Sequence, residues 1–310
     1  MHSDSVTREA YEKIVAPLPV PVWNSPLAVE LYGRTLTTVC RTRRGSTAGA
    51  WVCPLDVADE EDGGGQPAAR RAFRLLPYAS PWVDPGLHPV ERHRAVVSLL
   101  GAVMERVSAV ELPLDPCFGE PAALAEAGIE VLCRHTRWLD LRDSKDHRER
   151  YLPTARNHLR AAARRLRVRA VEPAEFDFSR AVVGQPEAAV SARRRAGLRL
   201  GWAGEAVRCL AAVDADGGCH GQVFVLRDEG VTVLMHSWFD RAGPRGAASL
   251  LVDAAIEEAV RDPRIDAFDF EGSVIPSIDR FMAGFGARAR AYGQLRWHRI
   301  GPSARVKEFG

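Results

Sequence analysis

The chain has 310 residues, of which 46% are hydrophobic and 26% are charged, and its formal net charge is +2. These values are ordinary for a globular protein, and the length allows two domains of usual size. No apolar run approaches the roughly 20 residues that a membrane-spanning helix needs, and the polar start, Met1–Lys13, lacks the apolar segment of a signal peptide. We therefore expect a cytoplasmic protein with no membrane partner.

In the N-terminal half, two strand-like runs precede a helix and a further short strand. The two runs are separated by a turn that contains Gly45. The acidic and then Gly-rich segment 59–69 is typical of a surface loop. Apolar residues at helical spacing predict the helix. The expected elements are the strands Thr35–Thr42 and Ala50–Val57, the helix His88–Val107 and the strand Ser108–Leu114.

A connecting region, about Trp138–Arg195, carries a predicted basic helix over Thr154–Leu166. Apolar residues fall on one face of this helix, and arginines at i, i+4 spacing fall on another. The segment Thr154–Arg169 holds six arginines and no acid, so it can attract a polyanion although the whole chain is nearly neutral. The apolar face is formed by Leu159, Ala163 and Leu166, and the basic face by Arg156, Arg160 and Arg164.

The second half repeats the order of strands, helix and strand. Turn signals at 214–218 and 228–230 separate three runs that are typical of antiparallel strands. We therefore predict two similar domains, 1–137 and 138–310, with the basic helix 154–169 in the second. The expected elements are the strands Ala206–Val213, Gly221–Arg227 and Val231–Phe239, the helix Gly246–Val260 and the strand Ala267–Phe270.

The six cysteines form neither a CxxC pair nor a zinc-like spacing with histidine. We expect buried or incidental thiols instead of disulfides, and no bound metal. The cysteines are Cys40, Cys53, Cys117, Cys133, Cys209 and Cys219.

Two segments of the second half resemble a known family. Thr154–Arg169, TARNHLRAAARRLRVR, resembles the "RRNIRKAEK-G-V-V" segment of the Fem-type (FemABX) family and its relatives in the GNAT superfamily. Asp269–Ala287, DFEGSVIPSIDRFMAGFGA, resembles the "DFEGSMI–IERFFRSFGG" segment of the same group. Between them, His236–Leu251 resembles the passage in which a strand precedes a G-A-S-L-L helix. The matches keep their order over about Trp138–Trp297.

This resemblance implies an α/β (α+β) chain of two tandem GNAT-like domains. Each domain would have a mixed, mostly antiparallel sheet flanked by helices. The resemblance also implies acyl transfer to an amine, typically from aminoacyl-tRNA onto a peptide or a small amine.

The candidate catalytic residues lie at the ends of two predicted strands. Amide formation from an activated ester needs a neutral amine, an acceptor for its proton, and donors for the developing oxyanion. Asp269 and Glu271 could bind the acceptor ammonium or relay its proton, or they could fix the following turn as structural carboxylates. His236 could accept a proton near neutral pH, or it could be a hydrogen-bonded strand histidine.

Neighbouring side chains are candidates for substrate contact. Trp238 could stack on a substrate or belong to the core, and Ser273 could contact substrate or cap the next helix. Fem-type ligases carry a lysine in an F-K-x-x-F-like segment, whereas here Met282 follows Phe281, so a neighbouring cation such as Arg280 would have to replace it. The predicted substrate-binding set is Trp238, Ser273, Arg280, Phe281 and Phe285.

The loop 240–246 leads into a helix whose N-terminal amides would suit a phosphate. The GNAT pattern for the pyrophosphate of coenzyme A, Q/R-x-x-G-x-G/A, is matched at Gly246 and Ala248, but its first position is Gly243. The arginines of the basic helix could follow the phosphates of an RNA, or they could form a solvated face. The predicted donor- or tRNA-binding set is Arg156, Asn157, Arg160, Arg164, Arg241, Arg245 and Gly246.

Three functions stay open at this point. The first is a transferase that moves an aminoacyl group from aminoacyl-tRNA to an amine of a small-molecule or peptide-like acceptor. The second is an acyl-CoA-dependent GNAT N-acyltransferase, and the third is a non-catalytic binding protein on a transferase fold. We expect no tightly bound cofactor beyond the aminoacyl-tRNA or acyl-CoA donor, and the oligomeric state stays open.

Overall fold

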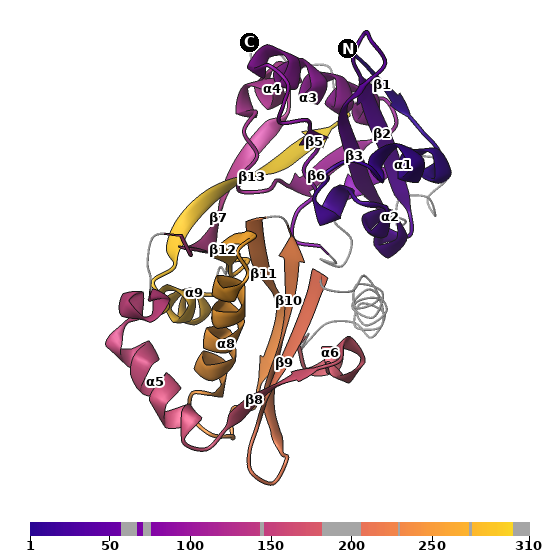
Figure 1. Cartoon of the computed structure of the whole chain (residues 1–310). Coiled ribbons are helices and arrows are strands. Elements are labelled where there is room, and N and C mark those ends of the chain that lie inside the picture. The colour runs from indigo at the N-terminus through magenta and orange to yellow at the C-terminus, as the bar shows by residue number, and fades with distance from the viewer. Residues whose placement is uncertain are drawn as a thin grey trace, which may run out of the picture. The chain divides into compact units, whose positions relative to one another are not determined.

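The computed structural model describes residues 1–56, 67–70, 76–142, 146–181, 206–228, 230–272 and 275–299. The chain divides into two compact units. Unit 1 comprises Met1–Arg134 and the chain from Tyr292 on, and unit 2 comprises His135–Ala291. Figure 1 shows the elements coloured along the chain. Each unit has a mixed, mostly antiparallel sheet with helices packed on it, which confirms the predicted fold class.

The strands of unit 1 lie in the order β1-β2-β3-β4-β6-β13, and β5 pairs with β3. β4 and β6 are parallel, and the other neighbours are antiparallel. The bounds are β1 His2–Ser5, β2 Thr35–Arg41, β3 Thr47–Asp56, β4 Ala68–Arg70, β5 Trp82–Val83, β6 Ala109–Pro113 and β13 Arg288–His298.

The predicted long helix of unit 1 is confirmed as α3, Pro89–Met104. Its residues at helical spacing are buried in the core of unit 1 beside Trp51 of β3 and Leu112 of β6. The apolar stripe explains the helix, since a 3.6-residue period aligns these side chains on one face. The buried residues are Val96, Leu99, Leu100 and Val103, and the other helices are α1 Arg8–Val15, α2 Pro26–Tyr32 and α4 Pro121–Glu126.

The strands of unit 2 lie in the order β7-β12-β11-β10-β9-β8. β11 and β12 are parallel, and the other neighbours are antiparallel. The predicted strands of this half are all present, with ends that differ by one or two residues. The bounds are β7 Glu130–Asp140 (in unit 2 from His135), β8 Arg167–Val171, β9 Val207–Val213, β10 Cys219–Asp228, β11 Gly230–Phe239 and β12 Ile265–Asp269.

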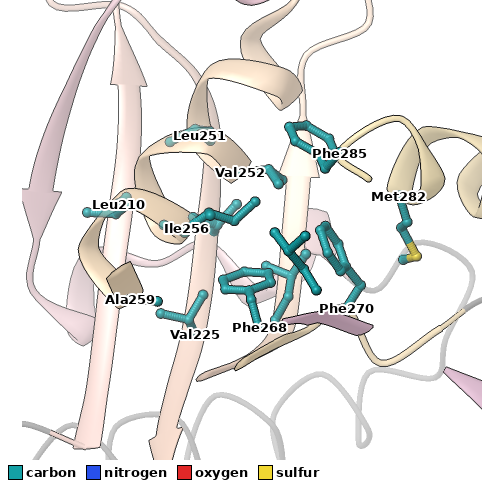
Figure 2. Close-up of a cluster of buried hydrophobic side chains, with 14 of the residues drawn as sticks. Leu210, Val225, Leu251, Val252, Ile256, Ala259, Phe268, Phe270, Met282 and Phe285 are labelled. Carbon is teal, nitrogen blue, oxygen red and sulfur yellow. The ribbon is translucent and has the colours of Figure 1, made fainter. Parts of the chain in front are cut away.

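The helix α8, Ala247–Arg261, covers one face of the sheet of unit 2. Figure 2 shows its apolar side over the sheet, with Leu251, Val252 and Ile256 facing strand residues such as Val225 and Phe268. The helix joins β11 to the parallel strand β12. The other helical elements of unit 2 are η3 His147–Arg150, α5 Pro153–Ala163, η4 Pro173–Glu175, α6 Phe178–Ala181 and α9 Pro276–Ala283.

The basic helix is confirmed as α5, but its buried face differs from the prediction. Ala155 and Ala162 are buried, as is Leu166 just beyond the helix, whereas Leu159 is half-buried and Ala163 is exposed. The small side chains of Ala155 and Ala162 let α5 approach α8 closely. Because alanine is less hydrophobic than leucine, the sequence pattern pointed to the face of Leu159 instead. None of the helices in the described ranges is both long and apolar enough to cross a membrane.

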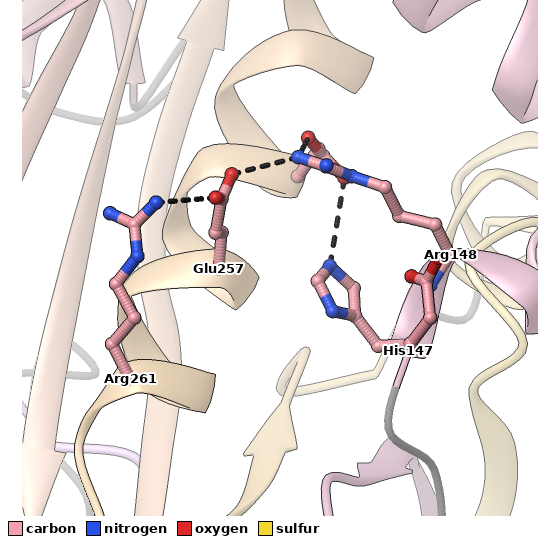
Figure 3. Close-up of polar contacts among 6 residues, drawn as sticks. His147, Arg148, Glu257 and Arg261 are labelled. Atoms are coloured by element: carbon pink, nitrogen blue, oxygen red, sulfur yellow. Dashed lines mark hydrogen bonds and ion pairs between the residues drawn. The ribbon is translucent and has the colours of Figure 1, made fainter.

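Ion pairs and hydrogen bonds among a cluster of charged side chains link η3 to α8 (Figure 3). Arg148 donates from Nε and Nη2 to the two oxygens of Asp253, at 3.0 and 2.8 Å, and from Nη2 to Glu257 at 2.7 Å. Asp253 is buried, and burial by itself would raise its pKa. His147, 3.8 Å away, and the Arg148 guanidinium outweigh burial and hold the pKa of Asp253 below its ordinary value.

The unit boundary lies within β7, three residues before the predicted domain boundary at 137/138. The prediction assigned all of 138–310 to the second domain, whereas the chain from Tyr292 on groups with unit 1. The physical reason is that β13 pairs with β6, with Leu295 opposite Leu112 and fully buried. In both units a helix lies between the two strands of a parallel pair, β4 and β6 or β11 and β12, whereas the sequence predicted only the repeated order of strands, helix and strand.

Candidate functional site

Three features of unit 2 meet at one end of its sheet because α8 connects two parallel strands. These features are the last part of β11, the end of β12 and the start of α8. β11 and β12 pair only over Gly230–Val233 and Ile265–Asp269 among the described residues, and β11 then continues to Phe239. Ligands of open α/β sheets bind beyond the carboxyl ends of strands, where neighbouring strands part. This end of the sheet is the candidate site.

A β-bulge lies on β11 just beyond the last residue that pairs with β12. Val225 of β10 pairs with Leu234, but Phe224 pairs with His236, so Met235 is an extra residue. Such a bulge reverses the alternation of side chains along the strand. Leu234 therefore lies on the face covered by α8, and His236 lies on the opposite face, beside Phe224.

The structure places His236 among aromatic rings. Its imidazole lies 5.7 Å from the ring of Phe178 and 6.0 Å from that of Phe224, and Phe176 completes the cluster. These contacts favour a packing role for His236, and its proton-accepting role stays a prediction.

Trp238 is a packing residue and not an open stacking platform. The side chain is 7% exposed, and its Nε1 donates to Oε1 of Gln222 at 2.8 Å. The guanidinium of Arg180 lies 4.1 Å from the ring centre. The prediction of a substrate contact is therefore corrected, because both the ring edge and the ring face already have partners.

Asp269 ends β12 and is fully buried. It lies on the face opposite Phe268 and Phe270, as strand alternation requires. Its Oδ1 accepts a hydrogen bond from Oγ1 of Thr136 on β7 and another from the backbone N–H of Glu271, at 2.9 Å. A buried carboxylate needs such donors. Asp269 therefore fixes the turn, which is the structural role that the sequence analysis gave as the alternative to binding the acceptor amine or relaying its proton.

Glu271 follows this strand in an unusual backbone conformation. Its φ of 60° is the only positive φ of a non-glycine residue in the described part of the chain. The side chain is half-buried. Gly272 also has a positive φ, 66°, and a Cβ there would lie 2.6 Å from the carbonyl oxygen of His135. Only glycine fits at 272, because the backbone there packs directly against the backbone of β7 and leaves no room for a Cβ.

The predicted substrate residues beyond this turn do not gather at the site. Phe285 is fully buried, in ring contact with Phe270, Tyr151 and Phe281, so its assignment as a substrate contact is corrected. Phe281, half-buried, packs against the same core. Met282 also points into that core (Figure 2). Arg280 is exposed on α9, and Ser273 lies outside the described residues.

The loop before α8 and the basic helix meet, although the sequence predicted them separately. Arg245 Nη2 lies 3.0 Å from Nε2 of His158 on α5. Gly246 has a φ of 92°, and a Cβ there would lie 2.3 Å from the carbonyl oxygen of His158. Gly246 therefore permits the close packing of α5 on α8, and it gives α8 no side-chain cap.

Three arginines at i, i+4 spacing lie on a different face of α5 from His158. We call Arg156, Arg160, Arg164 and Arg245 the basic patch; Arg156 is half-buried and the others are exposed. Among the described residues none of the four forms an ion pair with a carboxylate. Asn157 accepts a hydrogen bond from Arg160 at 3.2 Å, and Arg241 is exposed in the loop.

Three residues near the turn were missed by sequence reasoning. Thr136 holds Asp269, and Trp138 lies directly opposite Asp269 in the ladder of β7 with β12. The guanidinium of Arg290 covers the Trp138 ring at 4.2 Å. All three belong to strands that the sequence did not reveal. A hollow of about 740 Å³ lies in unit 1 beside Trp297 and contains none of the predicted site residues.

No protein-family model matches the sequence, and no curated protein sequence matches it. Solved structures do match over nearly the whole chain. FemX is 10% identical, covers 96% of this chain and 98% of its own, and has a TM-score of 0.66. A tandem GNAT protein from the clavulanic acid biosynthesis pathway is 17% identical, with coverages of 97% and 99% and a TM-score of 0.53. L-PGS from Bacillus licheniformis is 11% identical, with coverages of 96% and 95% and a TM-score of 0.57.

These likenesses establish the fold. The chain has the tandem GNAT-like fold that FemX and the tandem GNAT protein share, as the resemblance in the second half implied. A fold of this kind hosts more than one chemistry, so the reaction has to be argued from the site.

Proposed function

We propose that the chain is an acyltransferase that forms an amide bond, taking an aminoacyl group from aminoacyl-tRNA and transferring it to an amine. The observation that carries this proposal is the end of the β11–β12 pair. There β11 runs on past its partner with a bulge at Met235, next to the turn that carries Glu271. Backbone groups of a strand without a neighbour can hold an extended acyl donor and stabilise an oxyanion.

The reaction conserves atoms and charge in a simple way. The acceptor nitrogen attacks the carbonyl carbon of the aminoacyl ester, a C–N bond forms, and the C–O bond to the terminal ribose of the tRNA breaks. The attacking nitrogen gives up a proton and the ribose oxygen takes one. Glu271, half-buried beside the strand ends, is the residue that we assign to the acceptor ammonium and its proton.

The basic patch favours tRNA as the carrier of the donor. Three of its arginines follow i, i+4 spacing along α5, as a row of cations for successive phosphates would require, and Arg245 lies just before α8, which packs against α5. The same contact disfavours coenzyme A, because the carbonyl oxygen of His158 lies against Gly246 where the GNAT pattern would receive a pyrophosphate. A carbonyl oxygen and a phosphate compete for the positive end of a helix.

The direct test is an amide-forming assay with charged tRNA and a panel of small amines and peptides. Amide product that needs intact aminoacyl-tRNA supports the proposal. Product that persists after the donor pool is treated with ribonuclease contradicts it. Transfer from an acyl-CoA, or a rise in melting temperature with coenzyme A but not with tRNA, would establish the alternative donor.

The role of the basic patch is tested separately by binding. In the triple variant R156Q/R160Q/R164Q, we expect weaker tRNA binding and a flatter dependence of affinity on salt, by about 2–3 in the slope of log K against log salt. The matched control is R208Q, which removes a half-buried arginine of β9 in the same unit. An unchanged slope in the triple variant would remove α5 from the tRNA interface.

A further inference from the structure

The carboxyl end of the parallel pair in unit 1 carries a pocket that the proposed function does not use. β4 and β6 are parallel, as β11 and β12 are, and ligands of open α/β sheets bind beyond the carboxyl ends of such strands. β6 ends at Pro113, whose carbonyl accepts the N–H of Ala79 at 2.9 Å. The segment from Ala79 and the chain that continues to Glu120 therefore both lie just past this end. Together with η1 (Val22–Asn24) and α3 they line a pocket of about 270 Å³.

The walls of this pocket are mainly aromatic and proline side chains. Trp23 and Trp82 are buried and Phe118 is half-buried, so the core of unit 1 holds their rings in place. The volume is just below the range of about 300–1,000 Å³ that is typical of pockets for drug-sized ligands, so the pocket suits a smaller molecule with an apolar body. The apolar lining is Pro21, Trp23, Pro81, Trp82, Pro85 and Phe118.

An ion pair between two helices supplies charge of both signs to the same lining. Nε of Arg92 on α3 lies 3.0 Å from Oε1 of Glu120, which precedes α4, and the two side chains are 35% and 17% exposed. This Nε is buried and is not aligned for a hydrogen bond. Neither side chain makes another polar contact in the part of the chain that the structure describes. The two NH₂ groups of the guanidinium and Oε2 of Glu120 can therefore bind a ligand.

Two further polar residues line the pocket. Ser80 is 3% exposed, and its hydroxyl oxygen accepts the backbone N–H of Asp115. The carboxylate of Asp115 accepts the N–H of Cys117, so it holds the loop after β6 in place. The Ser80 hydroxyl keeps its own proton for a ligand, because none of the described groups accepts it.

A cation and an anion side by side on an apolar wall match a small zwitterion. Guanidinium NH₂ groups form charge-assisted hydrogen bonds with a carboxylate, and a carboxylate oxygen forms one with an ammonium group. Aromatic walls favour an apolar side chain. We propose that this pocket is a second ligand site, which binds a free α-amino acid with an apolar side chain. Its carboxylate lies on Arg92 and its ammonium group on Glu120. The site lies wholly within unit 1 and does not rest on the amide-forming function.

The first test compares ligands on the wild-type chain by calorimetric titration. L-Phenylalanine carries both charges, whereas phenethylamine lacks the carboxylate and 3-phenylpropanoate lacks the ammonium group. We expect L-phenylalanine to bind at millimolar concentration, at least about tenfold more tightly than either of the other two. L-Leucine tests a second apolar side chain. If neither amino acid binds, or if phenethylamine or 3-phenylpropanoate binds as tightly as L-phenylalanine, the proposal is overturned.

The second test places the bound amino acid at the ion pair. We expect R92Q and E120Q each to lower the affinity for L-phenylalanine by at least about tenfold. The matched control is E126Q, because the pair of His93 and Glu126, at 2.6 Å, joins the same two helices but does not line the pocket. E126Q should bind L-phenylalanine as the wild type does.

Thermal unfolding shows whether each variant is folded at the temperature of the titration. Equal affinity of the wild type, R92Q and E120Q would place the bound amino acid elsewhere and overturn the proposal. If a variant does not fold, the comparison of ligands on the wild-type chain still decides whether both charges are recognised. No readout requires acyl transfer, so failure of the amide-forming function leaves the second site standing, and failure of the second site leaves that function standing.

Discussion

At position 236 the structure places an imidazole between phenylalanine rings, whereas at position 271 it places a carboxylate on a fixed turn. We expect H236F to keep the aromatic contacts, with a change of less than about 1 kcal/mol in the free energy of unfolding and a change of less than about threefold in kcat/KM. We expect E271Q to lower kcat/KM by about 100-fold. Chemical denaturation and transfer kinetics measure both. A larger kinetic loss in H236F than in E271Q would reverse the two roles.

Gly246 is the residue on which the contact of α5 with α8 depends. Alanine there would meet the His158 carbonyl and would also need a positive φ. We expect G246A to lower the free energy of unfolding by about 2–4 kcal/mol. The control is G101A in α3, where a Cβ meets nothing within 4 Å, and a gain of about 0.5–1 kcal/mol is expected. Equal effects of the two substitutions in urea denaturation would contradict this account.

At the scale of helices and strands, the ion pairs that link η3 to α8 make the free energy of unfolding depend on pH. The pKa of Asp253 is lowered in the folded protein relative to an ordinary aspartate, about 3.9. The contribution of its contacts is therefore complete above about pH 5, and it is lost as the pH falls through 3.9 towards the folded-state pKa. We expect D253N to cost about 2 kcal/mol of unfolding free energy at pH 7 and much less at pH 3.

Urea denaturation of wild type and D253N at several pH values measures this dependence. E149Q, at an exposed glutamate of the same short helix, serves as the control and should follow the wild type throughout. A constant difference between wild type and D253N from pH 7 to pH 3 would mean that the contacts with Arg148 and His147 do not set the pH dependence.

The elements also show which parts of the fold the sequence could predict. α3 and α8 carry long apolar stripes, and β9, β10 and β11 are separated by strong turn signals, so all five were predicted to within two or three residues. β7 and β13 have mostly exposed or half-buried side chains and give no apolar pattern. Their pairing depends on partners more than 100 residues away in the chain, which local propensity does not encode.

The same reason limited the prediction of the candidate site. Asp269 and Glu271 were found because the DFEGS segment is contiguous in the sequence. Thr136 and the contact of Arg245 with His158 were not, since each joins segments about 90 or more residues apart. Nothing in the sequence predicted the positive φ of Glu271, because glutamate is not one of the residue types that commonly adopt this conformation.

At the scale of the whole chain, each unit has its own core, and the C-terminal strand belongs to the first. The buried cluster of unit 2 lies entirely within 139–287, whereas Leu295 of β13 belongs to the cluster of unit 1. The ladder of β13 with β6 runs from Gln294 to His298, and the N–H of Leu114 donates to the carbonyl of Gly293 at 2.7 Å. Unit 1 therefore needs a strand, β13, that is separated in the sequence from its other strands by the whole of unit 2.

Removing this strand should damage unit 1 selectively. In a chain that ends at Ala291, we expect backbone amides of β3 and β6 to lose hydrogen-exchange protection, while amides of β9 and β10 keep theirs. L295A in the full chain should act in the same direction, at a cost of about 2–5 kcal/mol for a fully buried leucine. R288A, at an exposed position of the same strand, should change stability by less than about 0.5 kcal/mol. Equal loss of protection in both units, or equal effects of L295A and R288A, would contradict the assignment of β13 to unit 1.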